Sequence, residues 1–246
     1  LLQKAKGLGA HFIATGHHAR IEADQANQLY LLKKGVDQHK DQSYFLYPLT
    51  QEQLSHTLFP IGNFSKERVR EIARKLGLPV AAKRESQEVC FIPAHDYAAF
   101  LREHIPQAAM PGPIMDERGN ILGRHRGILH YTIGQRKGLG IAAKEPLYVT
   151  ALMPDQNAVV VGTRKSLYAS ELIATDLNWI AITRVEHPIR VKARIRYRHP
   201  EAEATVIPLT DNEVYVKFAE PQMAITPGQA IVFYHGDTVI GGGTIS

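Results

Sequence analysis

Cysteine is almost absent from this sequence: its 246 residues include one, Cys90. A single cysteine cannot form a disulfide within the chain, and it excludes zinc or iron–sulfur sites that need several thiolates. Long apolar runs are also absent, since none approaches the roughly 18 residues of a membrane helix. The first residues, LLQKAKGLGAHF, lack the apolar core of a signal peptide. These absences predict a cytoplasmic protein without a membrane partner.

The composition that remains is typical of a folded protein. Hydrophobic residues make up 44% of the chain and charged residues 22%, which excludes disordered, collagen-like and coiled-coil proteins. The length fits one to three domains at about 150 residues each. The net charge of +5 mildly favours a polyanionic partner.

The residue pattern changes along the chain and predicts a multidomain α/β plus β protein. Up to about residue 95, short strands (a buried one over 11–16, another over 29–33) alternate with an amphipathic helix whose N-cap is Ser65. Short strands and turns follow from 110 to 163. After 164, strand-like runs recur at the spacing of a small barrel, at 172–182, 189–197, 204–209, 213–218, 230–234 and 238–240. We expect three domains, over 1–100, 101–163 and 164–246.

One predicted strand carries a cation at every second position between residues 190 and 198, which places these cations on one face. Like charges about 7 Å apart repel, so folding alone does not favour this row. Two interpretations are open: the row binds a phosphate backbone, or it is a solvated face paired with acidic side chains of a neighbouring strand. The cations are Arg190, Lys192, Arg194, Arg196 and Arg198.

Two loops hold further candidate residues. The glycine-rich loop 131–140 carries Arg136 and Lys137 and can approach phosphates closely, although it equally fits the end of a hairpin. Gly16 and His17 follow the first predicted strand, at the edge where open α/β sheets bind ligands. The paired histidines there have no third ligand at a recognisable spacing, so we expect no metal site.

Cys90 is ambiguous on its residues alone. Its place between Val89 and Phe91 is typical of an inert core cysteine. Lys83 and Arg84 would activate its thiol if the segment folded back on itself.

Six stretches, in one order along the chain, resemble the tRNA-specific 2-thiouridylase family (MnmA-type). They are ATGHHARI, KDQSYFLY, ESQEVCFIP, HRGILHYTIGQRKGLGI, RIRYRHP, and PGQAIVFY followed by GGGTI. The resemblance implies the C-terminal part of an ATP-pyrophosphatase-type (Rossmann-like) α/β domain, a small central domain and a C-terminal β-barrel that binds tRNA. It also implies an enzyme that adenylates the C2 oxygen of the wobble uridine with ATP, with Mg²⁺ expected, and replaces that oxygen by sulfur from a cysteine persulfide.

The resemblance implies roles for individual residues as well. Cys90 matches the persulfide-bearing cysteine, and Gly16 matches the glycine that contacts ATP. The positions that match tRNA contacts are His17, Lys40, Asp41, Gln42, Arg196, Tyr197 and Gln229, to which the patterns above add Arg136, Lys137 and Arg194. Strand alternation puts Tyr197 on the face opposite Arg196, so either the strand bulges there or the alternation is weaker. The other implied partner is a protein that donates persulfide sulfur.

Two features of the family are not in this sequence: a pyrophosphate-binding Ser-Gly-Gly-x-Asp-Ser loop, and a second cysteine in an Asp-x-x-Cys motif. The sequence also begins at Leu1, inside a predicted helix that runs directly into the first strand. We therefore expect that an N-terminal portion is missing and that this chain alone is inactive. Two alternatives from other classes are an RNA-binding module without chemistry, and a sulfur carrier that never activates RNA.

Overall fold

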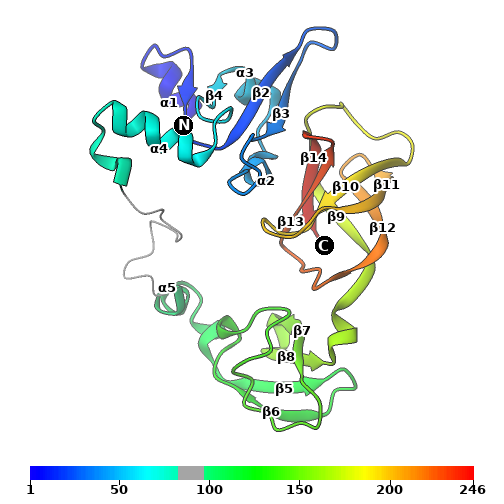
Figure 1. The fold of residues 1–246 in the computed structure, drawn as a ribbon. Coiled ribbons are helices and arrows are strands. Elements are labelled where there is room, and N and C mark those ends of the chain that lie inside the picture. Colours follow the sequence, from blue (N-terminus) through cyan, green and yellow to red (C-terminus); the bar gives the residue numbers. More distant parts are fainter. Residues whose placement is uncertain (83–96) are drawn as a thin grey trace. The chain divides into compact units, whose positions relative to one another are not determined.

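The computed structural model describes residues 1–82 and 97–246 (Figure 1). In these ranges the chain forms two compact units. The first comprises residues 1–82, 170–220 and 227–246, and the second comprises residues 97–169 and 221–226. None of the helices in the described ranges is long and apolar enough to span a membrane.

The first 82 residues form short helices and strands. The helices are α1 (Leu2–Gly7), α2 (Ser43–Leu46), α3 (Gln51–Ser55), α4 (Lys66–Lys75) and the 3-10 helix η1 (Pro79–Ala82). The strands are β1 (Ile13–Ala14), β2 (Ala19–Asp24), β3 (Leu29–Lys34) and β4 (Thr57–Leu58). β1 and β4 pair in parallel, whereas β2 and β3 form an antiparallel hairpin.

Two expectations for this part are confirmed and one is wrong. Ser65 caps α4, since its side chain accepts a hydrogen bond from the Arg68 amide, and the strand expected over 29–33 is β3. The buried strand expected over 11–16 is instead the two-residue β1, whose Ala14 is exposed. Among the described residues β1 pairs only with β4, so the neighbouring Phe12 and Leu58 remain 55% and 47% exposed.

Six strands of the first unit close into a barrel, drawn from yellow-green to red in Figure 1. Their order is β13-β10-β11-β12-β9-β14, and the pairing of β13 with β14 closes the ring. The barrel expected after residue 164 is therefore confirmed. The strands are β9 (Tyr168–Trp179), β10 (Ile189–Arg194), β11 (Ala202–Thr210), β12 (Glu213–Met223), β13 (Ala230–His235) and β14 (Thr238–Ile245).

β10 ends at Arg194, so the strand predicted to reach Tyr197 is wrong in its last residues. Ile195 turns into the core at 1% exposed, and the His199 amide donates to the Arg196 carbonyl at 3.1 Å, which closes a turn. Strand alternation therefore applies to 190–194 but not to the residues that follow. The predicted row of five cations on one face does not exist beyond Arg194, and Tyr197 needs no bulge.

The second unit is built on a four-stranded sheet of order β6-β5-β8-β7. Its helices are α5 (Tyr97–His104) and the 3-10 helices η3 (Pro106–Ala109), η4 (Ile128–His130), η5 (Pro154–Gln156) and η6 (Arg164–Leu167). The strands are β5 (Gly112–Asp116), β6 (Ile121–His125), β7 (Tyr148–Met153) and β8 (Ala158–Gly162). Ile114, Val149 and Val159 are fully buried at the centre of its core. The short strands and turns expected over 110–163 are confirmed.

A buried cluster joins the first 82 residues to the barrel inside the first unit. Leu32 of β3 packs in it together with Val232 and Tyr234 of β13, all with no exposed surface. β14 also pairs with β3 through Thr238 and Lys33, so the β2–β3 hairpin extends the barrel sheet. Backbone pairing and apolar packing thus hold distant parts of the chain together.

Glycines in β14 allow this close packing. A Cβ on Gly242 would lie 2.6 Å from the Ile231 carbonyl oxygen and 2.7 Å from Cδ2 of Tyr47. Gly241 and Gly243 would likewise place a Cβ within 2.6 Å of backbone oxygens on β9. These distances are well below those of real Cβ contacts, so the strand needs residues without a side chain.

We predict that Gly242→Ala lowers the free energy of unfolding by about 1–3 kcal/mol, because the added methyl group overpacks the junction of β13, β14 and Tyr47. The control is Gly7→Ala in α1, where a Cβ meets nothing within 4 Å among the described residues. Urea unfolding gives the free energy of unfolding of each variant. It is followed by the fluorescence of Trp179, the one tryptophan of the chain. Wild-type stability of Gly242→Ala would contradict this account.

Candidate nucleic-acid interface

Two of the predicted site segments are hydrogen-bonded to each other. The His18 amide donates to Oε1 of Gln42 at 3.0 Å, and the Gln42 amide donates to the His18 carbonyl at 3.0 Å. The loop that carries Gly16 and His17 therefore lies against the turn that carries Lys40. The Gln42 side chain serves this contact between the two segments.

His17 and Gly16 differ in how they are held. Nδ1 of His17 lies 2.8 Å from Oγ1 of Thr15, and its ring meets the Phe59 ring edge-on at 5.8 Å. Burial lowers the pKa of His17, so the ring is neutral at neutral pH and offers hydrogen bonds rather than charge. Gly16 is exposed after β1, and a Cβ there would meet no described atom closer than Cδ1 of Ile61 at 3.9 Å.

Asp41 points into the protein and is 3% exposed. Its Oδ1 accepts hydrogen bonds from the amides of Gly35 and Ser43 at 3.1 Å each, and its Oδ2 accepts one from Oγ of Ser43 at 2.9 Å. Oδ2 also lies 3.5 Å from Nη1 of Arg194. The carboxylate thus shapes the turn next to Lys40 and ties it to β10.

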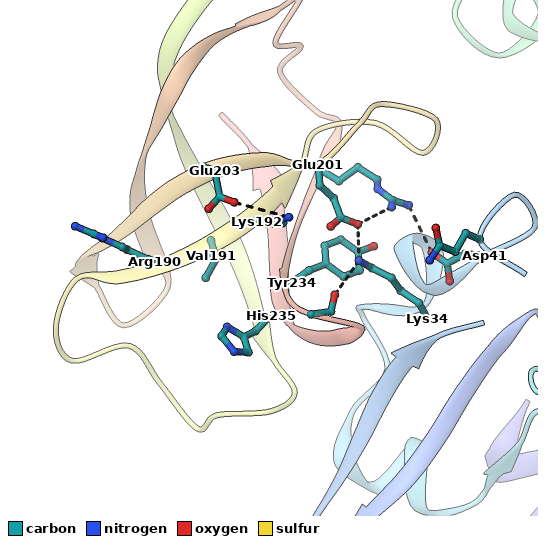
Figure 2. Close-up of a pocket in the computed structure, with 12 residues that line it drawn as sticks. Lys34, Asp41, Arg190, Val191, Lys192, Glu201, Glu203, Tyr234 and His235 are labelled. Atoms are coloured by element: carbon teal, nitrogen blue, oxygen red, sulfur yellow. Dashed lines mark hydrogen bonds and ion pairs between the residues drawn. The ribbon is translucent and has the colours of Figure 1, made fainter. Parts of the chain in front are cut away.

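Arg194 belongs to a network of ion pairs that Figure 2 shows beside a cavity of about 680 Å³. Its Nη2 lies 2.7 Å from Oε1 of Glu201, and the same oxygen lies 2.6 Å from Nζ of Lys34. The side chains of Arg194, Glu201 and Lys34 are only 15–16% exposed. We call Lys34, Asp41, Arg194 and Glu201 the ion-pair network.

The network rests on an aromatic ring. Nζ of Lys34 lies 4.5 Å from the ring centre of Tyr234, and Cζ of Arg194 lies 5.1 Å from it. Burial raises the pKa of Tyr234 far above its ordinary value, so this phenol is neutral. Cation–π attraction of this kind contributes about 0.5–2 kcal/mol, more where the cation is desolvated.

The structure pairs two cations of the basic strand with carboxylates. Lys192 lies 3.8 Å from Glu203 of β11, and Arg194 is paired with Glu201 just before β11. A carboxylate from β11 or from the residue just before it thus lies beside each of these two cations. The nearest exposed cation after β10 is Arg198, in the turn that follows.

An aromatic cluster lies beside the network. The rings of Phe45 and Tyr197 are 4.4 Å apart, and Tyr44 meets Phe45 edge-on at 5.4 Å. The Tyr44 hydroxyl donates to the Ala230 carbonyl at 2.8 Å, next to the exposed Gln229. Burial raises the pKa of Tyr44 to about 12, so it remains a neutral donor. The 40–47 segment, the turn after β10 and the start of β13 thus meet here.

The remaining predicted residues lie elsewhere. Arg136 and Lys137 are exposed in the second unit, on a loop whose flanking Ile133 and Leu139 are buried. The side chain of Gln135 closes this loop by donating to the Lys137 carbonyl at 2.9 Å. Cys90, with Lys83 and Arg84, is outside the described residues.

Sequence reasoning missed three residues of this interface: Lys34, Glu201 and Phe45. Glu201 could have been found by pairing the basic strand with the next strand along the chain. Lys34 and Phe45 gave no signal, because one ends an ordinary strand and the other belongs to an apolar run whose exposure depends on the fold.

Models of known protein families match the chain in three consecutive parts. Residues 1–94 match the tRNA methyl transferase HUP domain, residues 98–163 the tRNA methyl transferase PRC-barrel domain, and residues 169–245 the aminomethyltransferase beta-barrel domain. Together with the closed barrel, these matches confirm the predicted fold class: an α/β part, a small central domain and a C-terminal barrel.

Two relatives match along the whole chain at more than half identity. The tRNA-specific 2-thiouridylase MnmA 1 of Caldanaerobacter subterraneus subsp. tengcongensis is 55% identical over 245 residues, which cover 100% of this chain and 67% of that protein. The tRNA-specific 2-thiouridylase MnmA of Acetivibrio thermocellus is 54% identical over 245 residues, covering 100% of this chain and 68% of that protein. The chain belongs to the tRNA-specific 2-thiouridylase family. The family inferred from six short stretches is thus confirmed.

In this thiouridylase-family chain we predict that Arg194→Gln lowers the free energy of unfolding by about 2–3 kcal/mol, because it leaves buried carboxylates with one cation fewer. Arg198→Gln is the matched control and should change that free energy by less than about 0.5 kcal/mol, since its side chain is exposed. Urea unfolding monitored at Trp179 compares them. Equal stability of the two variants would show that the network does not hold the fold.

Proposed function

We propose that this chain acts in tRNA 2-thiolation, as part of a tRNA-uridine 2-sulfurtransferase. The observation that carries the proposal is the 55% identity, along the whole chain, to a relative named tRNA-specific 2-thiouridylase. The geometry supports it, because segments matching tRNA contacts of the family meet in one unit although they are far apart in sequence. These segments carry His17, Lys40, Arg196, Tyr197 and Gln229.

In the proposed reaction the C2 oxygen of the wobble uridine is adenylated by ATP, with Mg²⁺, and pyrophosphate leaves. The terminal sulfur of a persulfide on Cys90 then attacks C2, and AMP leaves with the oxygen. A second cysteine forms a disulfide with Cys90 and so releases the sulfur to the base. A donor protein supplies the persulfide sulfur. Because this sequence contains neither the second cysteine nor the pyrophosphate-binding loop, the reaction requires both from outside it.

Gly16 is proposed to let ATP approach the backbone. It lies at the carboxyl end of a parallel strand, the edge where α/β folds bind nucleotides. A Cβ at this position would make only an ordinary van der Waals contact, with Ile61, so the described part of the fold does not itself demand glycine here. A ligand that lies close to the backbone at this position would require glycine there.

We therefore predict that Gly16→Val raises the KM for ATP by about tenfold or more, through loss of at least ~1.4 kcal/mol of binding free energy. Its unfolding midpoint should match that of wild type, because a Cβ at this position is no closer than 3.9 Å to any described atom. Steady-state pyrophosphate release, measured with the chain as its gene encodes it, provides the KM. A KM for ATP equal to that of wild type in Gly16→Val would show that Gly16 is not part of the ATP site.

The test of the function itself is Cys90→Ser. Serine is nearly isosteric with cysteine but cannot carry a terminal sulfur, so the variant should form no thiouridine while its stability stays within about 1 kcal/mol of wild type. Wild type and Cys90→Ser are each assayed in the chain as its gene encodes it, with tRNA, ATP and a sulfide donor. Thiouridine is then quantified in the digested tRNA.

Three outcomes would contradict the proposal. Normal thiolation by Cys90→Ser would show that Cys90 carries no sulfur and is an inert core residue. Salt-sensitive tRNA binding by wild type without any thiolation would favour an RNA-binding module. Sulfur accumulating on Cys90 independently of ATP, with no transfer to tRNA, would favour a sulfur carrier.

A further inference from the structure

Phe45 differs from its neighbours in α2. It is 55% exposed, whereas Tyr44 and Leu46 on either side are 4% and 8% exposed. A single exposed apolar residue is ordinary on a protein surface. Phe45, however, lies against the ring of Tyr197 at 4.4 Å, so its exposed surface continues a second aromatic surface from another part of the chain.

The pair of rings packs against a third, buried ring. Tyr44 supports both, with ring centres 5.4 Å from Phe45 and 6.2 Å from Tyr197. Its hydroxyl is fixed by the hydrogen bond to the Ala230 carbonyl. A flat surface that is already ordered loses little conformational entropy when a flat ligand stacks on it.

Three cations, Lys40, Arg194 and Arg198, and one carboxylate, Asp41, act on the Tyr197 ring. The nearby carboxylates of Asp41 and Glu201 are 2% and 15% exposed and already face cations of the ion-pair network. Burial and the negative charge of Asp41 raise the pKa of the Tyr197 hydroxyl, whereas the positive charges of Arg198 and Lys40 lower it. An anion with an aromatic group is the ligand that this combination fits.

There is also space next to the rings. Tyr197 lines a cavity of about 730 Å³, and the charged residues that line it are Arg198, Arg194 and Asp41, the last two of them paired with each other. This lies within the range of about 300–1,000 Å³ typical of small-ligand sites. A ribose and its phosphates can therefore lie beside Tyr197 while the base covers Phe45.

From these observations we propose that Phe45 and Tyr197 form a stacking platform for an unpaired nucleobase of the tRNA, with the adjoining phosphate at Arg198. The proposal rests on the proposed function and adds a residue, Phe45, and a requirement for single-stranded nucleotides. A base inside a duplex has its faces covered by its neighbours and cannot stack on the platform.

The test compares Phe45→Leu with Phe12→Leu in the chain of 246 residues. Phe12 is equally exposed, at 55%, and lies in the same unit, so it is a matched control. Phe45→Leu should weaken tRNA binding about tenfold, the effect of losing one stacked base. Phe12→Leu should bind like wild type, and Phe45→Trp should keep the affinity.

Salt dependence separates stacking from disruption of the turn. Phe45→Leu should leave the slope of log K against log salt unchanged, whereas Arg198→Gln should flatten it by about 0.7–0.9. A single-stranded RNA carrying 2-aminopurine should be quenched by wild type and much less by Phe45→Leu. Binding of the matched RNA duplex should be equal for both.

The platform is overturned if Phe45→Leu binds tRNA as tightly as Phe12→Leu, or if it loses duplex and single-strand binding equally. In either case wild type would still bind tRNA, and the proposed function would stand. Failure of wild type to bind tRNA at all would overturn both. Tight binding of an apolar peptide instead of RNA would identify the rings as a protein contact.

Discussion

The ion-pair network is the interaction on which the described interface depends. Removing four charged side chains from water is costly, and the mutual attraction of the charges offsets that cost only where the geometry is good and other hydrogen bonds complete it. Here one oxygen of Glu201 serves both Lys34 and Arg194, and Asp41 is completed by two amides and a hydroxyl. Burial also protects these pairs from screening by salt. The segment after β3 is thus fixed to the barrel by contacts that solvent cannot easily replace.

This constraint divides the polar residues of the interface into two groups. Asp41, Gln42 and Arg194 hold the turns that carry them through side-chain contacts inside the protein. Lys40 and Arg198 lie at those turns, next to Tyr197. Residue type alone would have given all five the same role. The partners that the side chains of Asp41, Gln42 and Arg194 find inside the protein are not visible in residue type.

Local patterns in the sequence were sufficient for much of the fold. Alternating residues and turn residues predicted the barrel strands, and a serine before an amphipathic run predicted the start of α4, because both depend on residues close together in the chain. The end of β10 and the ion pair of Arg194 with Asp41 were not predictable in this way. They depend on the register between β10 and β11, where Lys192 is opposite Glu203, and on the contact with Asp41 from a distant segment. The exposure of Phe45 likewise depends on long-range packing.

A rigid interface has a physical advantage for chemistry on a nucleobase. A base must leave its stack before its ring atoms can be attacked, which costs a few kcal/mol. Side chains that were free to move would add their own ordering entropy to that cost, at about 0.5–1.5 kcal/mol each. In this protein the network and the hydrogen bond from Tyr44 to Ala230 order the interface within the fold itself. An aromatic surface held in this way can offset part of the unstacking cost, since the stacking it offers requires no further ordering of the protein.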